Sequence, residues 1–169
     1  GTVGFLTEGE VANIEEILDR LLTDDFTIEE RMMVTGTVTK ADGTTYRKSA
    51  LNDIVISRAG FSRLIGLNVS VDGQVLDTYE ADGVVISTPT GSTGYNLSAG
   101  GPIVSPDAEL LVITPVSPHS LTAKSIVLSG KERITIEITK KRKTQDTEAI
   151  CSFDGGNDVE SVSYTHLTL

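Results

Sequence analysis

The chain has 169 residues, of which 38% are hydrophobic and 22% are charged, and its formal net charge at pH 7 is −10. This length allows one domain with a buried core, while the negative charge argues against binding to nucleic acid or an anionic membrane, because both need clustered Lys and Arg. No apolar run approaches the roughly 20 residues that span a bilayer, and the single cysteine, Cys151, allows no internal disulfide, which favours a cytoplasmic location.

An amphipathic helix over residues 9–22 is the first predicted element. Thr7 and Glu10 have the spacing of a capping box, which marks a helix start. Apolar residues then recur at helical spacing, at Val11, Ile14, Ile17, Leu18, Leu21 and Leu22. Asp and Glu occupy positions between them, as expected for a solvent-facing side.

After the helix the sequence becomes typical of β-structure. Segment 27–40 is rich in Thr, Val and Met, and the Asp42-Gly43 pair after it predicts a hairpin with residues 44–48 as the returning strand. Asp42 is therefore interpreted as a turn residue. A second hairpin is predicted over 67–79, around Asp72-Gly73.

The remaining predicted strands are 54–56, 84–87, 110–114, 125–128, 133–138 and 149–153. Residues 84–87 form a continuous apolar run, which indicates a strand buried on both faces. Residues 96–99 resemble the last turn of a short helix that ends at Gly100-Gly101. The expected fold is therefore mostly β with few helices, in the α+β class.

The stretch TPTGSTGY, residues 88–95, joins the buried strand to the short helix. A strand that runs through a glycine turn into a helix gathers backbone N–H groups at one place, which suits an anion or the polar edge of a ring. Gly91 and Gly94 would let the backbone approach a ligand, and Tyr95 offers a stacking face. No Lys follows the glycines, so this is not a P-loop. The alternative is a turn whose hydroxyl groups only cap a helix.

TPTGSTGY closely resembles the TPTGSTAY segment of the NAD kinases, with Gly94 in place of the usual alanine. Other stretches resemble segments of that family in the same order: GTVGFLTE at 1–8, LNDIVI at 51–56, ADGVVISTPTGSTGYNLSAGGPIV at 81–104 and SFDG at 152–155. The resemblance implies the β-sandwich-like C-terminal domain of the NAD kinase fold over residues 1–156. Residues 157–169 follow no recognisable turn pattern and are expected to be a non-native or unstructured tail.

The same resemblance implies that the parent protein phosphorylates the adenosine ribose 2′-hydroxyl of NAD, with ATP or polyphosphate as donor and Mg²⁺ as helper, within a homo-oligomer. It places Asn52 and Asp53 on polar groups of the ribose or adenine, and Asp82 on the nicotinamide side. Residues implied to line the adenine and ribose pocket are Thr90, Thr93, Gly94, Tyr95 and Ser98. Phe5 would pack against the nucleotide, and Asp154 of SFDG would also contact NAD.

Each of these positions has an ordinary structural alternative. Asn52-Asp53 and Asp82 are also typical of turns beside strands, and Phe5 of a core residue. Asp154-Gly155 is a common hairpin pair.

The family's GGDGT motif, whose aspartate is the expected general base, does not occur in this sequence. The resemblance therefore implies a chain that binds NAD but is catalytically incomplete. Two further readings remain open: a non-catalytic nucleotide-binding or oligomerisation module, and part of a relative among the diacylglycerol-type lipid kinases. The polar residues at 52, 53 and 82 argue against an apolar lipid acceptor.

Overall fold

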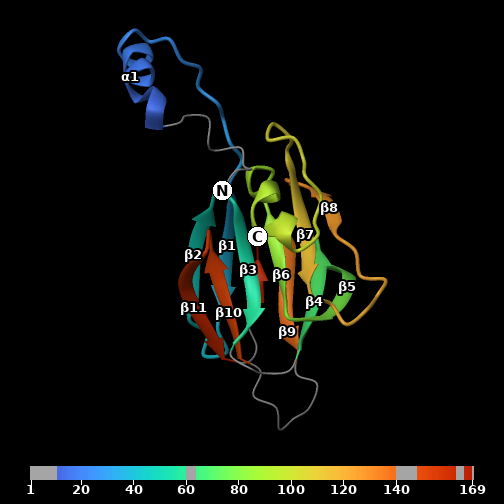
Figure 1. The fold of residues 1–169 in the computed structure, drawn as a ribbon. Coiled ribbons are helices and arrows are strands. Elements are labelled where there is room, and N and C mark those ends of the chain that lie inside the picture. Colours follow the sequence, from blue (N-terminus) through green and yellow to red (C-terminus); the bar gives the residue numbers. More distant parts are fainter. Residues whose placement is uncertain (1–10, 60–63, 140–147, 163–165, 169) are drawn as a thin grey trace.

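The structure is a computed structural model that describes residues 11–59, 64–139, 148–162 and 166–168 (Figure 1). Its helical elements are η1 (Val11–Asn13), α1 (Ile14–Leu22), η2 (Thr90–Thr93) and α2 (Tyr95–Ser98). Its strands are β1 (Val34–Thr39), β2 (Thr45–Ala50), β3 (Asp53–Arg58), β4 (Ile65–Val71), β5 (Gln74–Ala81), β6 (Gly83–Ser87), β7 (Leu110–Val116), β8 (Ile126–Ser129), β9 (Ile134–Thr139), β10 (Glu148–Phe153), β11 (Gly156–Val162) and β12 (His166–Thr168). None of the helices in these ranges is long and apolar enough to cross a membrane.

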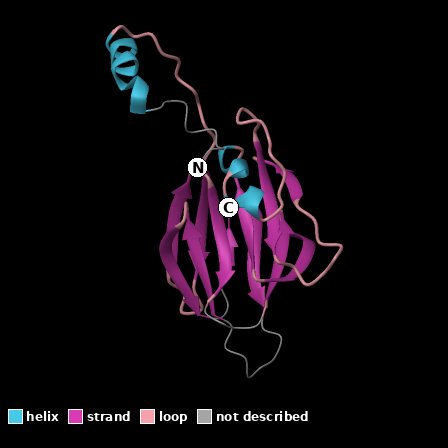
Figure 2. Ribbon diagram, viewed as in Figure 1, coloured by secondary structure: helices cyan, strands magenta, loops and turns pink. Residues whose placement is uncertain are grey.

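The strands form two six-stranded sheets, in the orders β2-β1-β12-β9-β4-β5 and β11-β10-β3-β6-β7-β8. Neighbouring strands in both sheets pair antiparallel. Figure 2 shows the strands as two layers, with the short helices η2 and α2 beside one end of them. The predicted mostly-β, sandwich-like fold is confirmed.

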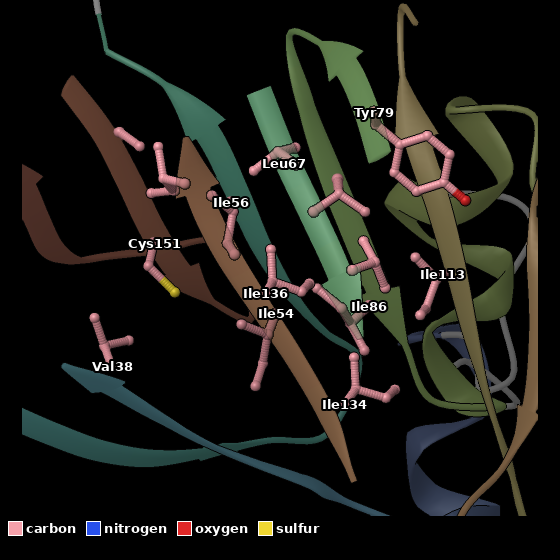
Figure 3. Close-up of a cluster of buried hydrophobic side chains, with 14 of the residues drawn as sticks. Val38, Ile54, Ile56, Leu67, Tyr79, Ile86, Ile113, Ile134, Ile136 and Cys151 are labelled. Atoms are coloured by element: carbon pink, nitrogen blue, oxygen red, sulfur yellow. The ribbon is translucent and has the colours of Figure 1, made fainter. Parts of the chain in front are cut away.

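The hydrophobic core lies between the two sheets (Figure 3). In a strand alternate side chains point to the same face, and the core takes alternate residues from each sheet. Ile54 and Ile56 come from β3, and Ile134 and Ile136 from β9. Fully buried Ile, Leu and Val side chains each contribute about 1.5–3 kcal/mol through the hydrophobic effect, so this apolar alternation accounts for the pairing of the sheets.

Strand β6 is buried along its whole length, as its apolar run predicted. Val84 and Ile86 face the core, while α2 packs against β6. Residues 88–95 follow β6 directly. This turn therefore begins at the end of a strand that is buried along its whole length.

The N-terminal part of the described chain differs from the sandwich. The predicted helix is present as η1 and α1 over residues 11–22, but no residue of α1 is buried, and Figure 1 shows the helix apart from both sheets. Residues 27–33 were expected to be β-structure, yet β1 begins only at Val34. The reason is pairing: β2 ends at Ala50, which faces Val34, so the preceding residues have no partner in β2.

Both predicted Asp-Gly hairpins are confirmed, and a third one changes the picture of the C-terminal residues. Asp154 and Gly155 both have positive φ, 50° and 73°, and turn the chain back so that β11 pairs with β10. β12 then lies between β1 and β9. The structure therefore differs from the expected unstructured tail over residues 157–162 and 166–168.

Candidate functional site

The candidate site lies at one end of two paired strands, β3 and β6. Asp53 at the start of β3 pairs with Ser87 at the end of β6. Residues 51–53 and the turn at 88–95 therefore meet at the same end of these two strands. The Thr88 N–H donates to the Asn52 carbonyl at 2.9 Å, and the Thr88 hydroxyl donates to the Leu51 carbonyl at 2.5 Å. Two motifs that the sequence analysis singled out separately thus form one unit.

The hydroxyl groups of Ser92 and Thr93 donate to carbonyls of the turn itself. Ser92 is fully buried and its Oγ donates to the Pro89 carbonyl at 2.7 Å. The Thr93 Oγ1 donates to the Thr90 carbonyl at 3.4 Å, and Thr90 is only 3% exposed. Ser92 therefore stabilises the turn, but the helix-capping alternative is wrong for its hydroxyl, because neither η2 nor α2 has a side-chain capping hydrogen bond. Gly94 and Tyr95 are exposed.

Asn96 fixes the far side of the turn and was missed by the sequence analysis. Its side chain is fully buried, and its Nδ2 donates to the carbonyls of Ser92 and Pro102 at 3.1 and 2.9 Å. Its Oδ1 accepts from the Thr114 hydroxyl of β7 at 2.7 Å. A Cβ at Gly101 would lie 2.1 Å from the same Oδ1, so the glycine makes room for the amide. An Asn inside a short helix before Gly-Gly was the available signal.

Asp154 lies in the turn between β10 and β11, and its side chain contacts residues at the same end of β3. Its carboxylate accepts hydrogen bonds from three successive backbone N–H groups: Leu51 at 2.8 Å, Asn52 at 2.7 Å and Asp53 at 3.2 Å. The Asp154 N–H donates in return to the Asp53 carbonyl at 3.0 Å. The hairpin alternative for Asp154-Gly155 is thus correct for the backbone, and the side chain adds a contact to the predicted site.

A pocket of about 420 Å³ opens where these elements meet. Its lining residues are Asn52, Asp53, Val55, Ser57, Gly94, Tyr95, Ser152, Asp154 and Gly155. Five of them were predicted as site residues, and they come from three separate motifs. A larger cleft of about 700 Å³ lies along residues 28–33 and 106–109 and contains none of the predicted residues.

The remaining lining residues follow from strand geometry. Side chains at Asp53, Val55 and Ser57 point to one face of β3, because they alternate with the core residues Ile54 and Ile56. Ser152 of β10 pairs with Val55 and extends the same face. Period-two alternation starting from Asp53 was the signal that identifies Val55 and Ser57. The position of Ser152 depends on strand pairing, which a single sequence does not reveal.

Asp53 is the most buried acidic group of the pocket, with 7% of its surface exposed. Burial, with a smaller contribution from the negative charge of Asp154, raises the pKa of its carboxyl to about 6. A buried carboxylate loses hydration and is further penalised by a like charge nearby. Asp53 is therefore mainly charged at neutral pH and takes up a proton in mildly acidic solution.

Not every predicted residue reaches this pocket. Asp82 lies before Gly83, at the opposite end of β6 from Ser87, and its Oδ1 accepts from Arg58 Nε at 2.6 Å. Five strand residues at about 3.3 Å each place roughly 16 Å between the two ends. Ser98 is exposed on α2, Thr90 is buried and Thr93 is half-buried, and none of the three lines the pocket. Phe5 lies outside the described residues.

Comparisons with known proteins show the family of this chain. Residues 51–167 match the family model for the ATP-NAD kinase C-terminal domain. The chain is 48% identical to an NAD kinase of Lachnoclostridium phytofermentans, over 95% of this chain and 57% of that protein. It is 46% identical to an NAD kinase of Agathobacter rectalis, over 95% of this chain and 56% of that protein. The chain thus spans little more than half the length of these relatives.

Two solved structures share the fold. The yeast NADH kinase complexed with NADH has a TM-score of 0.92 and 30% identity, covering 99% of this chain and 48% of that one. An NAD kinase from Archaeoglobus fulgidus in complex with ATP has a TM-score of 0.72 and 26% identity, covering 96% of this chain and 59% of that one.

Proposed function

Because this chain belongs to the NAD kinase family through its C-terminal domain, we propose that it is the NAD-binding part of an NAD kinase. The parent protein transfers a phosphoryl group from ATP or polyphosphate to the adenosine ribose 2′-hydroxyl of NAD and so makes NADP. Both the family match and the pocket at the edge of β3 and β6 support this proposal, and the pocket is the observation that carries it.

The pocket chemistry suits the adenosine half of NAD. The Asp53 carboxylate accepts hydrogen bonds from the two vicinal ribose hydroxyls, because an ionised carboxylate carries only acceptors. The Asn52 amide both donates and accepts at the adenine edge. Tyr95 is 44% exposed, and its ring stacks on the base. Gly94 has no side chain, so it leaves room for the ligand beside Tyr95. Aromatic stacking contributes about 0.5–1.5 kcal/mol beyond simple burial.

The other predicted residues take different parts in the proposal. Thr90 and Thr93 support the turn that carries the lining residues Gly94 and Tyr95. Ser98 contacts only a part of the nucleotide that extends out of the pocket. Asp82 receives the nicotinamide side away from Asp53, either within one chain or across a subunit contact of a homo-oligomeric parent. Asp82 is already paired with Arg58, so its second carboxylate oxygen is the group available to a ligand.

The metal and the phosphoryl donor are assigned to other parts of the parent. Among the described residues no group of three or more His, Cys, Asp or Glu side chains is placed to hold a metal ion. These residues therefore do not form a site that would hold Mg²⁺ by protein side chains alone. Asp42-Gly43-Thr44, the segment most like GGDGT, forms the β1–β2 turn, where the Thr44 N–H donates to Asp42 Oδ1 at 2.8 Å. We propose that the general base lies outside these 169 residues.

Isothermal titration with NAD, followed by an assay for NADP with ATP and Mg²⁺ present, tests this function. The proposal expects binding of NAD and no measurable NADP from the chain alone. Folded protein that binds neither NAD nor NADP would instead favour an oligomerisation module. Robust turnover by the chain alone would refute the claim that an external base is required, and binding of diacylglycerol in preference to NAD would favour the lipid-kinase reading.

A further inference from the structure

We propose that Asp154 is a positioning residue, whose carboxylate fixes the backbone of residues 51–53 and thereby aims the side chains of Asn52 and Asp53 into the pocket. The inference rests on the proposed function for the identity of the ligand, but its structural part is independent of that ligand. It assigns to Asp154 a role different from direct contact with NAD.

The three hydrogen bonds to Asp154 reach a stretch that the sheet itself holds weakly. β3 begins only at Asp53, so the N–H groups of Leu51 and Asn52 lie before its ladder. Asp154 Oδ2 accepts a hydrogen bond from the Leu51 N–H, and Oδ1 accepts from the N–H groups of Asn52 and Asp53. Successive N–H groups that converge on one anion form a concave binding arrangement, and hydrogen bonds to a charged acceptor are roughly twice as strong as neutral ones.

A second Asp-Gly turn in the same chain shows that hairpin formation does not require this arrangement. Asp72-Gly73 has nearly the same backbone, with φ of 49° and 80°. The Asp72 N–H donates to the Arg133 carbonyl at 2.9 Å, and the Arg133 N–H donates back to Asp72 Oδ1 at 3.1 Å. Asp154 makes this same reciprocal pair with Asp53 and adds the bonds from Leu51 and Asn52. Those two additional bonds are specific to the pocket edge.

Holding residues 51–53 also holds the opposite wall. The Asn52 carbonyl accepts from the Thr88 N–H, and the backbone of Gly91 lies directly against Asn52. A shift of the Asn52 backbone would therefore move the start of the turn that carries Gly94 and Tyr95. Asp154 thus acts on both walls through one backbone segment.

The charge of Asp154 has a second measurable effect, on the pKa of Asp53, which a purely structural role would not produce. Among the described residues it is the charged group that acts on Asp53 and raises its pKa, in addition to burial. Removing this charge favours the ionised form of Asp53, so the pKa of Asp53 falls below about 6 when Asp154 is neutralised.

Two variants separate charge from hydrogen bonding without straining the backbone. Asn and Gly both tolerate the left-handed conformation at position 154, whereas Ala does not. Asp154→Asn keeps one acceptor oxygen and loses the charge, and Asp154→Gly loses both. Asp72→Gly is the matched control, since it alters the same kind of turn away from the pocket.

The experiment measures three quantities on the 169-residue chain and its variants. These are the Kd of NAD by calorimetry, amide hydrogen exchange at residues 51–53, and the pKa of Asp53 by carboxyl NMR. Asp154→Gly is expected to weaken NAD binding about tenfold and to speed exchange at residues 51–53. Asp154→Asn should lower the pKa of Asp53 with a smaller loss of affinity, and Asp72→Gly should change none of the three.

Unchanged NAD affinity in Asp154→Gly, or unchanged exchange at residues 51–53, would overturn the proposal. Equal loss of affinity in Asp72→Gly would also overturn it, because the effect would then belong to any Asp-Gly turn. If the wild-type chain does not bind NAD, the proposed function fails. The exchange and titration measurements then still decide whether Asp154 fixes residues 51–53.

Discussion

A Cβ atom on Gly91 would lie 2.0 Å from the carbonyl oxygen of Asn52 and 2.8 Å from its Cα. The absence of a side chain at residue 91 is therefore what allows the 88–95 turn and the 51–53 segment to share one edge. This contact joins two sequence motifs that are almost 40 residues apart.

Substitution of Gly91 by alanine is expected to destabilise the fold. The added methyl group meets backbone atoms, which cannot rotate away, so the overpacking costs about 3 kcal/mol. Urea unfolding followed by circular dichroism measures the change.

Gly94→Ala is the matched control for that change. Its Cβ would lie 3.3 Å from the Gly91 carbonyl oxygen and 4.0 Å from Asp53 Oδ2, so a small adjustment relieves the contact. We expect a change within about 1 kcal/mol. Equal destabilisation by both substitutions would contradict the role given to Gly91.

Asn96→Ala is expected to reduce the free energy of unfolding by about 3 kcal/mol. The substitution leaves the buried carbonyl of Ser92 and the partly buried carbonyl of Pro102 without their amide donor and removes the acceptor of the Thr114 hydroxyl. Thermal unfolding by calorimetry measures the effect. Asn68→Ala serves as comparison, because Asn68 accepts a single bond from the Thr78 hydroxyl at an exposed position. A cost for Asn96→Ala no greater than that for Asn68→Ala would show that the buried network contributes little.

Stability should depend on pH through Asp53. Its folded-state pKa of about 6 lies above the unfolded value of 3.8, so the folded chain binds more protons between these two values. The contribution of Asp53 to stability is thus most favourable below pH 4 and is lost as the pH rises towards 6 and above. Asp53→Asn is accordingly expected to be more stable than the wild type at pH 7, by about 1–3 kcal/mol. Urea unfolding of both proteins at pH 4 and pH 7 tests this, and a stability difference that does not grow with pH would contradict it.

Affinity for NAD should follow the opposite trend. Protonation of Asp53 replaces an acceptor oxygen with a donor, so binding through the ribose hydroxyls weakens as the pH falls through about 6. Calorimetry from pH 5 to pH 8 measures this trend. The pH dependence should vanish in Asp53→Asn, and its persistence there would assign the titration to another group.

The sequence predicted the strands well wherever apolar residues alternate or run together, as in β6 and β9. It failed at residues 27–33, where β-prone residues have no partner strand, and at β11, which depends on the hairpin at Asp154 and Gly155. Local composition predicts conformation, but pairing depends on contacts between distant segments.

The candidate site was predicted in the same uneven way. Asn52, Asp53, Gly94, Tyr95 and Asp154 came from family motifs and line one pocket. The three bonds between Asp154 and residues 51–53 span more than 100 positions, so no local pattern indicates them. Asp82 was grouped with these residues by motif, although the direction of β6 places it at the other end of the strand.

The central claim is that the pocket at the end of β3 and β6 binds the adenosine half of NAD. Amide chemical shifts measured by NMR during titration with NAD test this claim most directly. The account predicts saturable shifts at Asn52, Asp53, Gly94 and Tyr95, reproduced by adenosine diphosphate ribose and saturating only at higher NAD concentrations in Asp53→Asn. Saturable shifts confined to other parts of the chain, or none at all in the folded protein, would contradict it.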